Sequence, residues 1–186
     1  LLADERGTLN GVDTTASAHA VLTAALKHCP RPDLILATGD LVHDGSVAGY
    51  RRLRAWLAGT GAPARVIPGN HDDPAVMAEC FAEGTVRWQA SQRLGHWQGE
   101  TLDSQVPGEA GGRLGTAQRD ELASRLAAGV GPVLIAVHHP PLAVGCVWLD
   151  GIGLADGPVL LRRLARSARP AVVVCGHAHQ EWARYG

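Results

Sequence analysis

The sequence is poor in features that mark several common classes of protein. Lysine occurs once, at Lys27, and arginine supplies nearly all of the positive charge. A formal net charge of −1 gives no general reason to expect a nucleic-acid polymer or an anionic membrane as a partner. Any phosphate chemistry must therefore depend on a local site.

Paired cysteines and long apolar stretches are also missing. The four cysteines are spread along the chain without a C-x-x-C pair, which argues against a zinc knuckle and a thioredoxin-type redox motif. We expect reduced, packed thiols in a cytoplasmic protein. No apolar stretch reaches the ~18 residues that span a bilayer, and the initial LLADERG lacks the features of a signal peptide. The sequence therefore predicts neither a membrane span nor a leader.

Short apolar runs rich in branched side chains, with Pro or Gly close by, predict buried strands rather than pieces of helix. The runs are residues 34–37, 65–67, 133–137 and 171–175, and a further strand is expected near 101–102. Between them, helices are expected over residues 15–28, 47–57, 74–81 and 117–128, and another opens at 157–158. In the first helix the predicted apolar face carries Ala18, Val21, Leu22, Ala25 and Leu26. This alternation predicts an α/β protein with parallel pairing, in one domain over residues 1–186.

Each of the four main strands is followed by polar groups that can bind a metal or transfer a proton. These groups are Asp40, then Asn70 and His71, then His138 and His139, and finally His177 and His179. Because the loops beyond the carboxyl ends of strands converge in open α/β sheets, we expect the groups to meet in space. Glycines at 39, 69 and 176 fit this expectation, since glycine lets the chain turn sharply at a strand end.

The expected ligands form a mixed set of Asp or Asn oxygens and imidazoles, which suits Mn, Fe or Zn better than Ca or Mg. Two histidines leaving one turn, His177 and His179, can bind two different ions, and Asp40 can bridge the pair. The sequence thus predicts two divalent or mixed-valence transition-metal ions. A hydroxide held between such ions is a nucleophile for in-line attack on phosphorus.

Plainer roles compete with these. Asp40 could cap a turn, and a Pro-Gly-Asn turn explains Asn70 without a metal, although the ordered set favours function for both. His139 has two equal interpretations, support of a metal ligand from behind and simple packing. Trp148 either stacks on a substrate base or anchors its glycine-rich loop. Surface histidines without a partner are expected at His19, His28 and His96.

Four motifs in order, GD at 39–40, GNHD at 69–72, HHPP at 138–141 and GHAH at 176–179, resemble the calcineurin-like metallophosphoesterases over most of the chain. The segments GVDTTAS, GDLVHDGS, LDSQVPG and GCVWLDGIGL further resemble the bacterial class III cyclic nucleotide phosphodiesterases, which act on 3',5'-cyclic AMP. The resemblance implies an enzyme that hydrolyses a cyclic nucleotide, a small-molecule phosphodiester, to the 5'-nucleotide. It also implies a four-layer sandwich of two packed mixed β-sheets flanked by helices.

Roles are implied residue by residue. The resemblance makes Asp40 the bridging ligand, Asn70, His138 and His177 ligands of the second metal, and His179 a ligand of the first. His71 would bind no metal and would instead protonate the departing ribose oxygen, a task suited to imidazole.

The chain departs from the family pattern in three places. The family's initial Asp-x-His motif is absent, so we expect the sequence to start just beyond it, without the first strand. The chain stops at Gly186, where relatives usually continue, so we expect the last strands to be missing as well. Position 43 is His where many relatives carry an Asp that orients the catalytic histidine, and Asp44 is a candidate substitute.

Two other functions stay open. One is a phosphodiesterase for glycerophosphodiesters or other nucleotide diesters, and the other is a silent module that only binds nucleotide or a partner protein. A homodimer also stays open, because the sequence does not specify an oligomeric state.

Overall fold

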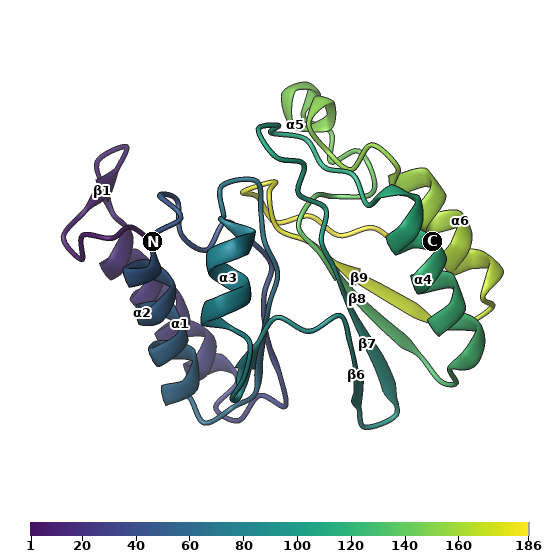
Figure 1. Ribbon diagram of the computed structural model, residues 1–186, viewed down its shortest axis with the longest axis horizontal. Coiled ribbons are helices and arrows are strands. Elements are labelled where there is room, and N and C mark those ends of the chain that lie inside the picture. Colours follow the sequence, from purple (N-terminus) through teal and green to yellow (C-terminus); the bar gives the residue numbers. More distant parts are fainter. Residues whose placement is uncertain (186) are drawn as a thin grey trace. The chain divides into compact units, whose positions relative to one another are not determined.

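The computed structural model describes residues 1–185 and divides into two compact units, Leu1–Trp88 and the part from Gln89 onward. Each unit has its own sheet, its own helices and its own apolar core (Figure 1). Each is described in turn.

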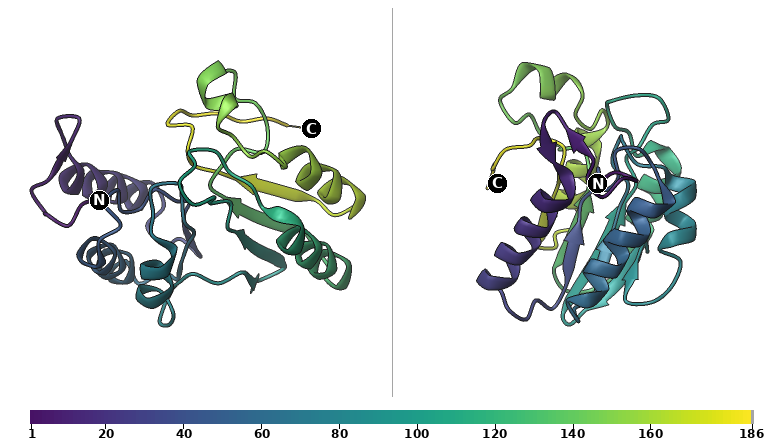
Figure 2. Two further views of the ribbon diagram at one scale, coloured as in Figure 1. Left: turned by 45° about the horizontal axis from the view of Figure 1, so that its top comes forward. Right: turned by 90° about the vertical axis from the view of Figure 1, so that its left-hand side faces the viewer.

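The first unit alternates strands and helices after a short hairpin. Its elements are β1 (Thr8–Leu9), β2 (Val12–Asp13), α1 (Thr14–His28), β3 (Ile35–Ala37), α2 (Val47–Gly59), β4 (Ala64–Val66), α3 (Pro74–Cys80) and β5 (Val86–Arg87). The strands β3, β4 and β5 form a three-stranded sheet in that order, and both of its pairings are parallel. The helices α1 and α2 lie beside each other on one side of this sheet (Figures 1 and 2).

Side-chain oxygens fix where the helices of the first unit begin. Asp13 accepts the N–H of Ala16 at 2.8 Å at the start of α1, and Ser46 accepts the N–H of Gly49 at 3.3 Å in α2. Asp73 caps α3, and Pro74 follows as its first residue, as the sequence predicted. The core of this unit centres on Tyr50, Met77 and Phe81, all fully buried.

The apolar face predicted for the first helix is only partly correct. No residue of α1 is buried, and Val21 is 67% exposed. Ala18, Leu22 and Leu26 are half-buried, and Leu22 packs against the core of the unit. The contact face is therefore a narrow stripe with a spacing of four residues, which excludes Val21 and Ala25.

The second unit holds a mixed sheet. Its elements are β6 (Ser91–Leu94), β7 (Trp97–Leu102), α4 (Gly115–Ala128), β8 (Val133–Val137), α5 (Val147–Gly151), α6 (Gly157–Arg166) and β9 (Ala171–Val174). The strand order is β6-β7-β8-β9, with β6 antiparallel to β7 and the other pairs parallel. The helices α4 and α6 lie side by side against this sheet (Figure 1), and Leu122 and Leu160 are buried in its core.

The α/β class, with sheets flanked by helices and extensive parallel pairing, is confirmed. The four main strands and five helices lie within two residues of their predicted bounds. The strand expected near 101–102 is longer than predicted and begins at Trp97. No helix within the described residues has both the length and the apolar character needed to cross a membrane.

Candidate functional site

Two predicted site segments of the first unit lie beside each other because β3 and β4 are parallel. Asp40 follows β3, and Asn70 and His71 follow β4. The backbone N–H of His71 donates a hydrogen bond to Asp40 Oδ1 at 3.1 Å. Asn70 is half-buried and lies directly before His71 in the same turn. The carboxylate predicted to bridge two metals and the histidine predicted to transfer a proton are thus neighbours.

A buried carboxylate, which the sequence analysis did not single out, holds these two turns together. Asp72 accepts hydrogen bonds from Leu41 N–H at 3.0 Å, Val42 N–H at 2.9 Å and Gly69 N–H at 2.9 Å. The hydroxyl of Tyr50 donates to Asp72 Oδ1 at 2.9 Å. Because these donors come from the β3 turn, the β4 turn and α2, one side chain fixes three segments. In the sequence, Asp72 is visible as the last residue of the GNHD motif.

The ring beside His71 is that of His43. Their centroids lie 4.5 Å apart with the planes tilted by 40°, and both residues are exposed. Asp44, considered as a support for the catalytic histidine, instead accepts the N–H of Ala3 at 2.7 Å and that of Ser46 at 3.2 Å. Burial would raise the pKa of Asp44, but these hydrogen bonds outweigh it and lower the pKa below its usual value.

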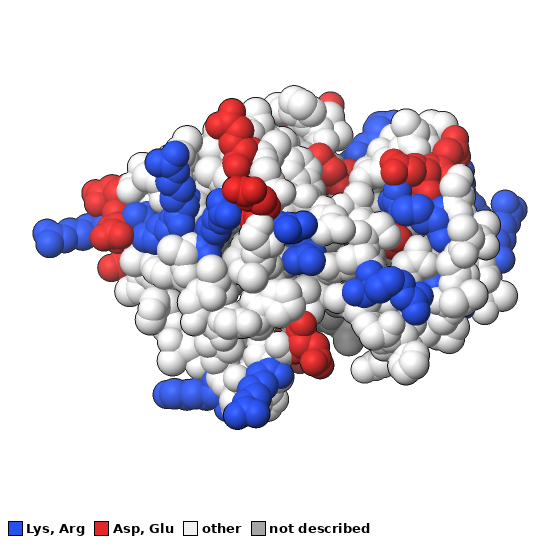
Figure 3. All heavy atoms as spheres, turned by 60° about the horizontal axis from the view of Figure 1, so that its bottom comes forward, with Lys and Arg blue, Asp and Glu red and all other residues white. Residues whose placement is uncertain are grey.

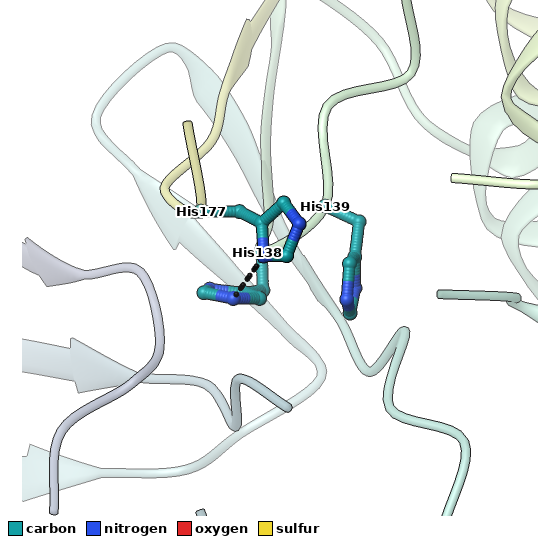
Figure 4. A group of neighbouring side chains, drawn as sticks. All are labelled: His138, His139 and His177. Carbon is teal, nitrogen blue, oxygen red and sulfur yellow. Dashed lines mark hydrogen bonds between the residues drawn. The ribbon is translucent and has the colours of Figure 1, made fainter. Parts of the chain in front are cut away.

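The second unit brings two predicted ligands together in the same way. His138 directly follows β8, and His177 follows its parallel neighbour β9 after two residues. The N–H of Gly176 donates to the carbonyl of His138 at 3.0 Å, which continues the pairing past the strand ends. His177 Nδ1 and His138 Nε2 lie 3.2 Å apart (Figure 4). Their rings are 5.1 Å apart and nearly perpendicular.

Backbone conformation marks the predicted ligands. Five non-glycine residues in the described part of the chain have positive φ, and three of them are Asp40 (54°), His177 (63°) and His179 (50°). The N–H of Ala178 donates to Gly176 O at 2.7 Å, so His177 is the central residue of a γ-turn. Non-glycine residues in this strained left-handed conformation are concentrated at functional sites.

Glycines 39, 69 and 176 were expected to allow sharp turns at the strand ends, and one of the three adopts the backbone conformation that favours glycine. Gly39 has a φ of 98°, but Gly69 and Gly176 do not occur among the glycines with positive φ. At the end of β9 it is the histidines themselves that adopt the left-handed conformation.

His139 lies next to this pair and is held by two hydrogen bonds. Its Nδ1 lies 2.8 Å from Ser104 Oγ, and its Nε2 lies 3.1 Å from the carbonyl oxygen of Ala110. Since a carbonyl only accepts, Nε2 carries the proton and donates it, and Nδ1 accepts from the serine hydroxyl. His139 is fully buried, and its ring lies 4.6 Å from that of His177. Both ring nitrogens of His139 are thus engaged in hydrogen bonds.

The donors that face each other fit a transition-metal ion. Two imidazoles on one tetrahedral ion, each at roughly 2.0–2.1 Å, have nitrogens about 3.3 Å apart. The nitrogens of His177 and His138 are 3.2 Å apart, and a group of His138, His139 and His177 has ligand atoms within 4.8 Å of one another. His179 is exposed and lies outside this group of three.

Trp148 lies on the short helix α5 with 71% of its surface exposed. An aromatic side chain that anchors a loop is usually buried, and Trp148 is not. Asp150, on the same helix, ties the loop instead by accepting the N–H of Val144 at 2.7 Å.

The predicted site residues therefore form two groups, one in each unit. Asp40, Asn70 and His71 lie on adjacent turns of the first unit. His138, His139 and His177 form a cluster at the end of β8 and β9 in the second.

Comparisons with known proteins match nearly the whole chain. Residues 14–181 match the family model described as calcineurin-like phosphoesterase. A probable cyclic nucleotide phosphodiesterase of Synechococcus is 39% identical over 180 residues, which is 97% of this chain and 70% of that protein. The 3',5'-cyclic adenosine monophosphate phosphodiesterases CpdA of Pseudomonas aeruginosa and Escherichia coli K12 are 37% and 38% identical, over 99% and 97% of this chain and 68% and 66% of their own lengths.

Substitution Asp72→Asn tests the buried carboxylate. The amide replaces one acceptor oxygen with an NH₂ group that faces other donors, so the free energy of unfolding should fall by about 1–3 kcal/mol. The control is Asp73→Asn, next in the chain, because asparagine caps a helix as well as aspartate does. Urea denaturation measures both variants. Equal stability of the two would show that Asp72 does not hold the turns.

Proposed function

The chain belongs to the calcineurin-like phosphoesterase family, and from this premise we propose that it is a metal-dependent phosphodiesterase that opens 3',5'-cyclic AMP to the 5'-nucleotide. The observation that carries the proposal is the pair of imidazole nitrogens 3.2 Å apart at the ends of β8 and β9. The choice of cyclic AMP is supported by the relatives named CpdA, whose printed names give this substrate.

The two units are proposed to work as one domain over residues 1–186. Support comes from the family match, which runs through both units without a break from residue 14 to residue 181. In this proposal Asp40 and Asn70 of the first unit and His138 and His177 of the second would hold a common pair of ions. Each unit already presents its groups at the carboxyl edge of parallel strands.

The proposed ligands are divided between two sites. Asn70, His138 and His177 would hold one ion, His179 would contribute to the other, and Asp40 would bridge them. Oxygen and imidazole donors without thiolate suit Fe or Mn, with Zn as a further candidate. A bound pair of such ions supplies a nucleophile at neutral pH and neutralises charge on the phosphoryl oxygens. The four cysteines are free, in keeping with the reducing cytoplasm as the proposed location.

The protein's own contribution to bond cleavage is proposed to come from His71. His71 is exposed, its backbone N–H donates to Asp40, and its ring lies 4.5 Å from that of His43. An imidazolium here would give its proton to the ribose 3'-oxygen as the P–O bond breaks. Imidazole suits this step because its ordinary pKa lies near neutrality.

A turnover panel with the full-length protein tests the substrate. With Mn²⁺ or Fe²⁺ added, cyclic AMP should give the highest kcat/KM, ahead of cyclic GMP and glycerophosphodiesters, and a chelator should abolish turnover. Product release is followed by chromatography. Preference for a glycerophosphodiester would point to the second kind of phosphodiesterase. Binding of nucleotide without turnover would establish the silent module.

Substitution His177→Ala tests the metal site. Metal content, measured by inductively coupled plasma mass spectrometry, should fall together with activity, which should drop by more than roughly 100-fold because a direct ligand is lost. The matched control is His96→Ala, which removes an exposed histidine of the same unit. Full metal content in His177→Ala would remove His177 from the ligand set.

Substitution His71→Ala tests the proton donor. Hydrolysis of cyclic AMP, which has a poor leaving group, should slow by roughly 10²–10⁴-fold. Bis(p-nitrophenyl) phosphate, whose leaving group needs no proton, should lose much less, and metal content should stay unchanged. His28→Ala, at an exposed position on α1, is the control. An equal loss on both substrates would contradict the role of general acid.

A further inference from the structure

A groove between the helices α4 and α6 of the second unit is lined by four arginines. The cavity measures about 650 Å³, and its basic residues are Arg162, Arg163, Arg166 and Arg169. Small-molecule sites in proteins commonly measure roughly 300–1,000 Å³. Its volume is therefore that of a site for a small molecule.

The groove is basic, whereas the chain as a whole is close to neutral. The protein has a formal net charge of −1. Arg163 pairs with Asp120 at 2.6 Å, and within the described residues the other three arginines of the groove form no ion pair. Figure 3 shows basic side chains on the right-hand side of the face it draws, beside a group of acidic ones.

Two of the arginines have free donors. Arg162 and Arg166 are exposed and lie one helical turn apart on α6, and neither has a hydrogen bond or ion pair within the part of the chain that the structure describes. Both guanidinium groups therefore remain free to bind an anion in the groove.

Arg169 is held in place by hydrogen bonds and offsets the negative charge at the C-terminal end of α4. Arg169 donates to the carbonyls of Leu126 at 3.0 Å, Val130 at 3.1 Å and Gly131 at 2.7 Å, and to Gln98 Oε1 at 2.8 Å. These carbonyls form the C-terminal end of α4 and the loop after it, where the helix dipole would repel an anion. Their pairing with Arg169 offsets that repulsion.

Part of the groove lining is apolar. Ala123, Leu126, Ala127 and Val159 line the groove together with the arginines. Guanidinium groups bind phosphate through two parallel hydrogen bonds, and apolar side chains can accept the flat face of a ring. We propose that this groove binds a nucleotide that carries two or more adjacent phosphate groups. Neither the candidate active site nor its histidines take part.

The test compares two double variants. ATP binding is measured by isothermal titration calorimetry with excess chelator, so that metal sites do not contribute. Arg162→Ala/Arg166→Ala should raise the Kd for ATP tenfold or more relative to the unmodified protein. The control Arg31→Ala/Arg51→Ala removes two exposed arginines of the first unit and should leave the Kd unchanged.

Equal Kd values in the two double variants would overturn the proposal, as would tighter binding of polyglutamate than of ATP by the unmodified protein. The latter result would assign the groove to an acidic protein partner. A circular dichroism melt checks folding, and Arg166→Gln replaces the double variant if that variant unfolds, with a rise in Kd still expected. The measurement needs no turnover, so it stands apart from the proposed phosphodiesterase activity.

Discussion

In a parallel pair of strands, both chains leave the sheet at the same edge, and the loops that follow are forced to be neighbours. The protein uses this constraint twice. The pair β3 and β4 sets Asp40 beside His71, and the pair β8 and β9 sets His138 beside His177. These residues are separated by 31 and 39 positions in the chain. Everything proposed about catalysis depends on these two edges.

Parallel pairing brings the loops together but does not fix their side chains. That task falls to buried polar groups behind each edge. Asp72 gathers donors from two turns and α2, and His139 is held between Ser104 and the carbonyl of Ala110. Because both are buried and satisfied by specific partners, the neighbouring site residues gain fixed positions. The left-handed backbone at Asp40 and His177 is sustained by the same surroundings.

Much of this arrangement could be predicted from the sequence. The main strands carry continuous branched apolar residues, and polar groups follow each one, so both their positions and the grouping within each unit were foreseeable. The start of β7 was not, because the polar residues Gln98 and Glu100 precede the strand expected near 101–102. They are buried nonetheless, since Arg125 pairs with Glu100 at 2.7 Å and Gln98 and Ser91 also donate to its carboxylate. Such compensation depends on residues far along the chain and leaves no local signal. Asp72 escaped notice for the same reason, as its partners lie up to 31 positions away.

The environment of His139 also restricts a position far from it in sequence. A Cβ at Gly112 would lie 2.2 Å from Nδ1 of that imidazole, closer than any real contact, so the glycine is required by the bulk of the histidine. Positions 112 and 139 are therefore coupled sterically. Over evolutionary time a larger residue at position 112 becomes tolerable only after the imidazole has been exchanged for something smaller, and the two positions should therefore co-vary.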